Sequence, residues 1–385
     1  MNKDRYNKNR ALNLLKGIIP SLIGFFIPIY KRRIIFNSGF NLEFNDNSKY
    51  LFFHFLKYNP EFEIKFVIND RIKRHKLIKS YGEHFISSNS LKSIFYILQS
   101  KTWVTSSLET PIGGFFLAKR RNIFHLGHGA PLKNIGLSEK YNNWKKIIYY
   151  HILKGNFSYF ISTSDVFSTN WSKCIDLSKA NVLVSGQARN DTTIKLAESG
   201  KSFSNHRSVL YAPTWRPFSE TEIFPFEDKD LALLNEHLIV LGVVIYVRLH
   251  PNFNLQNDNG YKNFSNIEIL SRNTVNDINE VLGLFDLVIT DYSSIYIDFL
   301  LTRKPVLFLP YDYEQYKHTI GFSIDYHDNT PGPKPQNQVE FIYELKMLIE
   351  SKEYYSDERN KVNSRLNSIQ NDHCKSNADL IISYL

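Results

Sequence analysis

Short apolar segments alternate with helical stretches along the whole chain of 385 residues, and this rhythm constrains the fold more than any other feature. Expected strands in the first half are 33–38, 62–69, 102–107, 122–128, 157–163 and 182–186. Those in the second half are 208–214, 243–250, 267–270, 284–290 and 305–310. Expected helices are 47–58, 71–80, 140–153 and the tail at 338–385. Such alternation predicts an α/β fold with parallel sheets, and continuous apolar strands indicate sheets covered on both faces.

A polar stretch from Asp191 to Arg207 interrupts this rhythm and predicts a boundary between two α/β domains. We therefore expect an amino-terminal segment at 1–32, a first domain at 33–195 and a second domain, with terminal helices, at 196–385. Two doubly wound parallel-sheet domains that face each other leave a cleft. Ligands in such folds bind at the carboxyl ends of the strands.

The charge balance predicts an acidic partner, because the formal net charge is +9. Candidates are nucleic acid, a phosphate-bearing substrate and an anionic membrane surface. The basic residues are not interleaved with stacking aromatics, so we expect no nucleic acid. A hydrophobic fraction of 43% and a charged fraction of 22% exclude a disordered, collagen-like or polytopic membrane chain. Two cysteines, Cys174 and Cys374, are too few for a disulfide scaffold and fit a reducing cytoplasm.

The amino-terminal run from Ala11 to Tyr30 is apolar and flanked by basic residues. It barely reaches the ~20 apolar residues of a spanning helix, and Pro20 and Pro28 interrupt it. We expect an interfacial element whose apolar side chains enter the bilayer while lysines and arginines meet anionic headgroups. A helix buried on the first domain and a true membrane span are the alternatives.

Four polar clusters directly follow expected strands. The first runs from His128 through Gly129 and Pro131 to Lys133. The imidazole of His128 fits a general base or a phosphate contact, because its unperturbed pKa lies near neutrality. The alternative is a loop histidine that caps a helix.

Two further clusters carry arginines. Strand alternation places Arg248 and His250 on the same side, where both can contact an anion. Thr214 and Arg216 follow the first strand of the second half, and the planar guanidinium of an arginine suits phosphate. The alternatives are an exposed strand end and a hinge loop, respectively.

The fourth cluster is a hydroxyl-rich turn between a strand and a helix, from Thr290 through Asp291 to Ser293 and Ser294. The two serines can cap the helix, and the same turn can bind phosphate. We expect Asp291 to position a sugar hydroxyl, orient a histidine or act as a base.

Several signatures of other chemistries are absent from the sequence. It contains no GxxxxGK[ST], no strand-linked GxGxxG, no HExxH and no CxxC. It also shows no carboxylate cluster suited to Mg²⁺. We therefore expect no cofactor and no obligatory metal.

Together these motifs resemble the CDP-glycerol glycerophosphotransferase family of teichoic acid and related surface-polymer enzymes. They are HGAPLKNIG (128–136), APTWR (212–216), RLHP (248–251), TDYSSIYIDF (290–299) and PVLFLPYD (305–312), with FNDNSKYLF (44–52) upstream and GFSIDY (321–326) and PGP (331–333) downstream. The resemblance implies a GT-B-like fold and transfer of an alditol phosphate from a CDP-alditol, with release of CMP. The acceptor is a hydroxyl on a lipid-linked molecule at the cytoplasmic face of the membrane, where such enzymes are peripheral.

The resemblance also implies roles for individual residues. His128 and His250 match the family's catalytic histidines, and Ser293 and Ser294 match its donor pyrophosphate turn, with Asp291 beside them. We expect Thr214, Arg216, Arg248 and Thr290 to complete the donor side. Gly129, Pro131 and Lys133 are expected on the acceptor side, in the first domain. The sequence departs from the family pattern at Ala130, at the turn from Gly186 to Arg189 and at Ile320.

Length and motif content leave two questions open. A chain with one catalytic unit resembles primase-like members, although a short polymerase fits as well. A nucleotide-sugar-dependent GT-B glycosyltransferase of surface polysaccharide synthesis is the alternative enzyme. A basic membrane-associated scaffold protein is the alternative without catalysis.

Overall fold

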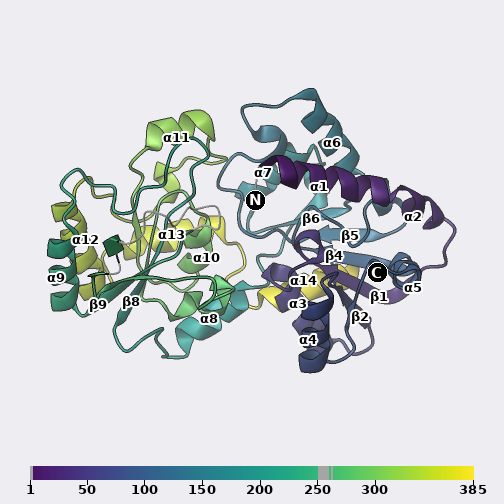
Figure 1. Cartoon of the computed structure of the whole chain (residues 1–385), viewed down its shortest axis with the longest axis horizontal. Coiled ribbons are helices and arrows are strands. Elements are labelled where there is room, and N and C mark those ends of the chain that lie inside the picture. The colour runs from purple at the N-terminus through teal and green to yellow at the C-terminus, as the bar shows by residue number, and fades with distance from the viewer. Residues whose placement is uncertain (1–2, 250–259, 262) are drawn as a thin grey trace. The chain divides into compact units, whose positions relative to one another are not determined.

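The computed structural model describes residues 3–249, 260, 261 and 263–385, and the chain divides into two compact units. Unit 1 is built from residues 1–130, 135–189 and 371–385, and unit 2 from residues 131–134 and 190–370. Both units have α/β folds with parallel sheets, which confirms the expected fold class at that level (Figure 1). That the two units face each other across a cleft stays a prediction.

Unit 1 contains a seven-stranded parallel sheet in the order β3-β2-β1-β4-β5-β6-β7. Its strands are β1 (Tyr30–Asn37), β2 (Glu63–Val67), β3 (Phe85–Ile86), β4 (Ser100–Thr105), β5 (Asn122–His125), β6 (Tyr159–Ser162) and β7 (Val182–Val184). Its helices are α1 (Lys3–Lys16), α2 (Ile18–Ile23), α3 (Asp46–Tyr58), α4 (Arg71–Tyr81), α5 (Leu91–Leu98), α6 (Trp144–Lys154), α7 (Asp165–Ile175) and α14 (His373–Ser383).

Both faces of this sheet are buried, which explains the continuous apolar strands. In β1, Ile34 and Phe36 point into a core with α3 and α14, whereas Ile35 points into the opposite core with α5, α6 and α7. All three side chains are fully buried. Successive side chains of a strand alternate between faces, so every position must be apolar when helices cover both.

The last helix of the chain corrects the expected domain limits. We expected all terminal helices in the domain at 196–385, but α14 packs on α3 and belongs to unit 1. Ala378 and Ile381 of α14 are buried in the same core as Phe52 and Phe55 of α3. The apolar face of α14 is therefore satisfied by a segment more than three hundred residues earlier, which local sequence does not reveal.

The amino-terminal segment packs on unit 1 through the turn between α1 and α2. A Cβ atom on Gly17 would lie 1.8 Å from the backbone of Gly113, so only glycine permits this approach. Arg10 forms an ion pair of 2.7 Å with Glu109. Within the described part of the chain, no helix is both long and apolar enough to cross a membrane. The segment therefore has one packed side, as expected of a helix that is bound to its domain.

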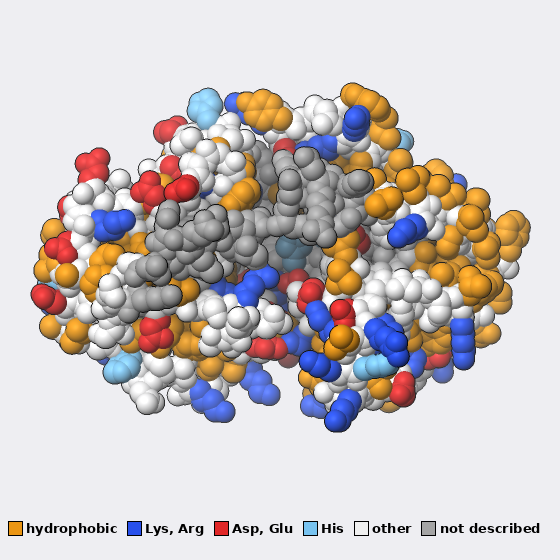
Figure 2. Space-filling model, in the orientation of Figure 1, with side chains coloured by type: hydrophobic (Ala, Val, Ile, Leu, Met, Phe, Trp, Pro, Cys, Tyr) orange, Lys and Arg blue, Asp and Glu red, His pale blue; other side chains and the backbone are white. Residues whose placement is uncertain are grey.

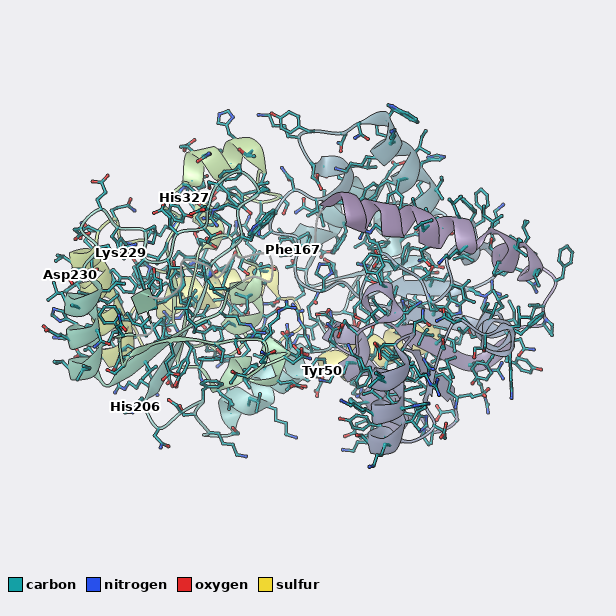
Figure 3. The ribbon with its side chains drawn as sticks, viewed as in Figure 1. Tyr50, Phe167, His206, Lys229, Asp230 and His327 are labelled. Atoms are coloured by element: carbon teal, nitrogen blue, oxygen red, sulfur yellow. The ribbon has the colours of Figure 1, made fainter. Side chains whose placement is uncertain are left out.

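Unit 2 contains a five-stranded parallel sheet in the order β10-β9-β8-β11-β12. Its strands are β8 (Arg207–Ala212), β9 (Val243–Val247), β10 (Ile267–Ile269), β11 (Leu287–Thr290) and β12 (Val306–Phe308). Its helices are α8 (Asn190–Glu198), α9 (Leu231–Leu241), α10 (Ile295–Leu300), α11 (Tyr313–Thr319), α12 (Gln338–Glu350) and α13 (Ser356–Leu366). Helices α9 and α12 lie side by side at one edge of the unit, and Asp230, labelled in Figure 3, caps α9 through its side chain.

The polar stretch that we expected to separate the domains also has a different structure from the one predicted. Residues 191–207 were expected to separate two domains, with the limit at 195/196, but most of their first half forms α8 and the division falls at 189/190. Helix α8 packs on the short 3₁₀ turn Leu282–Leu284. A Cβ atom on Gly283 would lie 2.0 Å from the carbonyl oxygen of Thr193, so the close contact requires glycine. The polar stretch therefore begins unit 2 as a packed helix.

Candidate active site

His128 lies at the carboxyl edge of the unit 1 sheet, three residues after β5, and its side chain is exposed. Its Nδ1 atom is 3.4 Å from the carbonyl oxygen of Ser106, which follows the neighbouring strand β4. A carbonyl only accepts hydrogen bonds, so Nδ1 carries the proton in this contact. The lone pair of Nε2 is then available to accept a proton from a substrate.

The backbone around His128 is held by one glycine conformation and by two polar side chains. Gly129 has a φ of +144°, a conformation that favours glycine. Asn47 of α3 donates a hydrogen bond of 2.8 Å to the carbonyl of Gly127, and Arg189 donates one of 3.1 Å to the carbonyl of His128. Sequence reasoning assigned no role to Asn47 or Arg189, although both lie in segments that were singled out. Their positions indicate that they hold the histidine loop in place.

His125, only three residues earlier, is a histidine of a different kind. It is buried, and its ring packs against Phe157, Phe160 and Trp171. Burial, with smaller contributions from His128 and Arg10, lowers its pKa well below the usual range. His125 is therefore neutral and belongs to the core of unit 1.

Lys133 lies in unit 2, which differs from its expected place in the first domain. Residues 131–134 attach to the segment after α11: the backbone N–H of Asn134 donates to the carbonyl of Gly321, and that of Ser323 donates to the carbonyl of Leu132. The Ser323 hydroxyl also donates to the carbonyl of Pro131. Residues 131–134 take part in these bonds through their backbone groups, so the residue types of the motif gave no signal of them.

The ammonium of Lys133 faces the polar centre of unit 2. It lies 5.7 Å from the ring centroid of Tyr316, and its charge interacts with those of Asp291 and Arg216. Burial is the largest influence and lowers the pKa of Lys133 to about 8, with Arg216 acting in the same direction and Asp291 opposing it. No hydrogen-bond acceptor within the described residues is recorded for this ammonium.

Arg216 forms the centre of a buried ion cluster rather than an open phosphate contact. Its Nε and Nη2 atoms each donate a bond of 2.8 Å to the carboxylate of Asp312, and its Nη1 donates one of 2.7 Å to Asp291. Its guanidinium also lies near the rings of Tyr292, Tyr311 and Tyr316. The Arg216 side chain is fully buried, and two carboxylates occupy its donors. We therefore assign it to positioning.

The carboxylate of Asp291 is likewise hydrogen-bonded within unit 2. Besides Arg216, its carboxylate accepts bonds from the backbone N–H groups of Thr214, at 2.9 Å, and of Tyr292. It is 1% exposed, so the expected role as a catalytic base is replaced by one that ties two strand-end loops together. Asp312, which anchors Arg216, was part of a quoted motif but received no role from the sequence.

The tyrosines around this cluster are kept neutral. Burial raises the pKa of Tyr292, with further contributions from Asp312 and its hydrogen bond. Burial also raises the pKa of Tyr311 to about 12. Their hydroxyls therefore act as neutral hydrogen-bonding groups at physiological pH.

The remaining residues expected on the donor side fall into two groups. Thr290 and Arg248 hydrogen-bond backbone carbonyls: the Thr290 hydroxyl donates a bond of 2.8 Å to the carbonyl of Ala212, and Arg248 donates one of 3.0 Å to that of Ser271. The hydroxyls of Thr214 and Ser294 have fewer hydrogen bonds. The Thr214 hydroxyl is buried with no partner among the described residues, and Ser294 precedes α10 without a capping bond from its side chain.

Ser293 and His250 complete the expected set. Among the described residues, the Ser293 hydroxyl has one long hydrogen bond, of 3.4 Å, accepted from the N–H of Ile295. His250 lies outside the described residues. Among the residues that the structure does describe, no group of three or more His, Cys, Asp or Glu side chains is arranged to hold a metal ion.

Solved structures show how widely this fold is shared. A structure of the wall teichoic acid polymerase TagF matches with a TM-score of 0.74 over 99% of this chain and 93% of that chain, at 21% identity. A putative UDP-N-acetylglucosamine 2-epimerase from Listeria monocytogenes matches with a TM-score of 0.56 over 92% of this chain, at 14% identity. At these identities the likeness shows the fold alone.

Sequence relatives are more informative. The teichoic acid poly(glycerol phosphate) polymerase of Bacillus spizizenii is 26% identical over 375 residues, covering 89% of each chain. The teichoic acid glycerol-phosphate transferase of Staphylococcus aureus is 22% identical, covering 86% of this chain and 87% of that protein. The polymerase of Bacillus subtilis is 28% identical over 84% of this chain, which spans only 44% of that relative's length.

A match over most of the chain shows to which family the protein belongs. Residues 21–378 match the sequence profile of CDP-glycerol:poly(glycerophosphate) glycerophosphotransferases. That range includes every strand of both sheets and most of both units. The protein therefore belongs to the CDP-glycerol:poly(glycerophosphate) glycerophosphotransferase family.

Proposed function

We propose that this enzyme transfers glycerol phosphate, or a related alditol phosphate, from CDP-glycerol to a hydroxyl of a lipid-linked acceptor and releases CMP. The acceptor is a glycan or polyol phosphate used in the synthesis of teichoic acid, capsule or a related surface polymer. The observation that carries the proposal is the exposed imidazole of His128, held with Nε2 open in a chain that matches this family over residues 21–378.

The reaction begins with the acceptor hydroxyl at His128. Its proton passes to Nε2 as its oxygen attacks the phosphorus that bears the glycerol. The bond from that phosphorus to the bridging oxygen of CMP breaks, and the electron pair leaves with CMP. Positioning and charge stabilisation provide most of the catalysis in phosphoryl transfer. We retain His250 as a second catalytic residue from the family motif.

The donor phosphates are assigned to unit 2. The buried Thr214 hydroxyl has no partner among the described residues, so a phosphate oxygen would satisfy it. Ser293, Ser294 and Lys133 supply further hydroxyls and a positive charge. Arg216 supports this set indirectly, because it fixes Asp291 and thereby the backbone of Thr214. We propose that no metal is required, so turnover should be undiminished in EDTA.

CMP release tests the reaction directly. The full-length protein is incubated with CDP-glycerol and, in parallel, CDP-ribitol, UDP-GlcNAc and UDP-glucose, each with a lipid-linked acceptor. We expect CMP from one CDP-alditol only. UDP release would instead establish the alternative, a nucleotide-sugar-dependent glycosyltransferase. The fold does not decide between the two, because a putative UDP-N-acetylglucosamine 2-epimerase shares it.

We further propose that unit 1 rests on the cytoplasmic face of the membrane as a peripheral protein. Exposed apolar side chains of α1 and α2 include Leu15, Ile19 and Leu22, and Phe26, in the turn after α2, is 88% exposed. Exposed Trp144, Ile147 and Ile148 of α6 add to these, and α6 lies beside α1 through the contact of Arg10 with Tyr149. Hydrophobic side chains gather over this part of unit 1 in Figure 2.

Liposome flotation tests this surface. Phe26→Ser should weaken binding to vesicles that contain anionic lipid, because it removes apolar area that enters the bilayer. Val339→Ser is the matched control, since Val339 is 70% exposed on α12 of unit 2. Equal flotation of both variants and the wild type would contradict the proposed surface.

A further inference from the structure

An open pocket of 520 Å³ lies at the carboxyl ends of β2 and β3 in unit 1. Arg71 and Arg74, from the first turn of α4, line one side. Asn69, Ser87 and Ser90, from the loops after the two strands, line another. None of the residues that line the pocket is acidic. It is therefore a polar and positively charged site, separate from the residues assigned to catalysis.

The two guanidinium groups retain donors for a ligand. Arg74 uses Nη1 to bond the carbonyls of Ile68, at 2.7 Å, and Asn69, at 3.3 Å, while its Nε and Nη2 bond no acceptor among the described residues. Arg71 is exposed, and no ion pair is recorded for it among the described residues. The carboxylate of Asp70, which precedes α4, caps the helix by accepting from the backbone N–H of Lys73, at 2.7 Å. Two arginines with unused donors on one wall match the oxygens of a phosphate group.

The serine and asparagine side chains indicate what surrounds that phosphate. Asn69 accepts from the hydroxyls of Ser87 and Ser88, so the loop after β2 is tied to the loop after β3. This gives a shaped wall of hydroxyl and amide groups next to the arginines. Such groups hydrogen-bond polyol hydroxyls and ether oxygens.

The pocket lies on the same sheet edge as His128. Between β2 and β5 the sheet order places only β1 and β4. At about 4.8 Å per strand, the pocket lies about 14–19 Å along the edge from the end of β5. This is too far for the phosphate that accompanies the attacked hydroxyl. It suits a phosphate further back in a short polyol phosphate chain.

We propose that this pocket binds a phosphodiester of the acceptor, several repeats before the hydroxyl that His128 activates. The inference rests on the proposed function, since it gives the acceptor's class: a polyanionic polyol phosphate rather than a neutral glycan. The acceptor chain lies along the carboxyl edge of the unit 1 sheet. Arg71 and Arg74 therefore make the enzyme prefer acceptors that already carry phosphate.

The test uses the full-length protein with the double variant Arg71→Gln/Arg74→Gln. Its matched control is Lys76→Gln/Lys79→Gln, which removes the same charge from exposed positions of α4 outside the pocket. Acceptors are a glycerol phosphate monomer and a water-soluble glycerol phosphate oligomer. We expect the pocket variant to raise KM for the oligomer by at least about tenfold, as for the loss of charge-assisted hydrogen bonds. The KM for CDP-glycerol and that for the monomer stay unchanged.

Arg71→Gln alone guards against a folding defect, because it leaves the bond from Arg74 to Ile68 in place. It should raise the oligomer KM in part. An oligomer KM that is unchanged, or that changes equally in the lysine control, overturns the proposal. Oligomer binding can also be measured directly by calorimetry, so the site is testable even if the protein releases no CMP. Absence of CMP release would contradict the proposed function and not the pocket.

Vesicles distinguish the other source of phosphate. If the pocket binds lipid headgroups, the double variant floats less well with phosphatidylglycerol vesicles than the lysine control does, and its oligomer KM is unchanged. That result would overturn the acceptor assignment. Equal flotation of the two variants, together with the raised oligomer KM, supports it.

Discussion

Breaking the buried ion cluster in unit 2 should cost far more stability than breaking an exposed ion pair of the same length. Arg216→Met removes the cation that bonds both Asp291 and Asp312 and puts an apolar side chain in its place. The two carboxylates are then left close together in a buried site. We compare this substitution with Asp312→Asn and with the double variant in a mutant cycle.

The magnitude follows from burial. The Arg216 side chain is 0% exposed and those of its partners 2% and 10%, so removing it should cost about 3–5 kcal/mol of unfolding free energy. In the double variant only Asp291 stays charged, and the N–H groups of Thr214 and Tyr292 still bond it. We therefore expect a coupling energy of about 2–3 kcal/mol between the two positions.

Hydrogen exchange of β8 and β11, measured by mass spectrometry at increasing urea, reports on unit 2 alone. The control cycle is Lys73→Met with Glu43→Gln, a pair 2.7 Å apart, close to the 2.8 Å between Arg216 and Asp312, but 38% and 48% exposed. Its coupling, measured on β2, should be about 0.2–1 kcal/mol. If the buried pair couples no more strongly than this exposed pair, the positioning role of Arg216 is refuted.

Three other outcomes are expected. His128→Ala should lower CMP release by about 10²–10⁴-fold with unchanged circular dichroism, and normal turnover would exclude His128 as the base. Burial lowers the pKa of Lys133 to about 8, so its positive charge is present below that pH and lost above it. The KM for CDP-glycerol should therefore rise above about pH 8 in the wild type but not in Lys133→Arg, and parallel profiles would contradict the donor role. Ile381→Ala should destabilise unit 1 by about 2–5 kcal/mol, visible as faster exchange in β1 but not in β8, and equal exchange in both would separate α14 from that core.

The strands were the part of the fold most readable from sequence. The segment at 102–107 was expected as a strand and contains most of β4, at Ser100–Thr105, while the segment at 305–310 contains β12, at Val306–Phe308. Strands buried on both faces must be continuously apolar, which makes them conspicuous. Strand β3 was missed because two residues are too few for a pattern, and α8 was taken for a boundary because its exposed face is polar.

The candidate site was only partly readable. The sequence placed His128, Thr214 and the serine turn after strands, and the structure has them there; their roles stay predictions from the tendency of strand ends in this fold class to collect functional groups. It also predicted that Arg216 binds donor phosphate and that Asp291 is catalytic, whereas the structure pairs them with each other. An arginine in a sequence does not indicate whether a phosphate or a carboxylate will neutralise its guanidinium.

The sequence by itself determined the α/β class, the parallel sheets and the family, because these depend on local patterns and on motif order. Tertiary structure decided to which unit α14 and Lys133 belong, and which carboxylates bond Arg216. Each of these depends on groups far apart in the chain, such as Asp312, 96 residues after Arg216. Sheet topology brings such residues together, and burial then makes their pairing obligatory, since an unpaired charge in the core is too costly to persist.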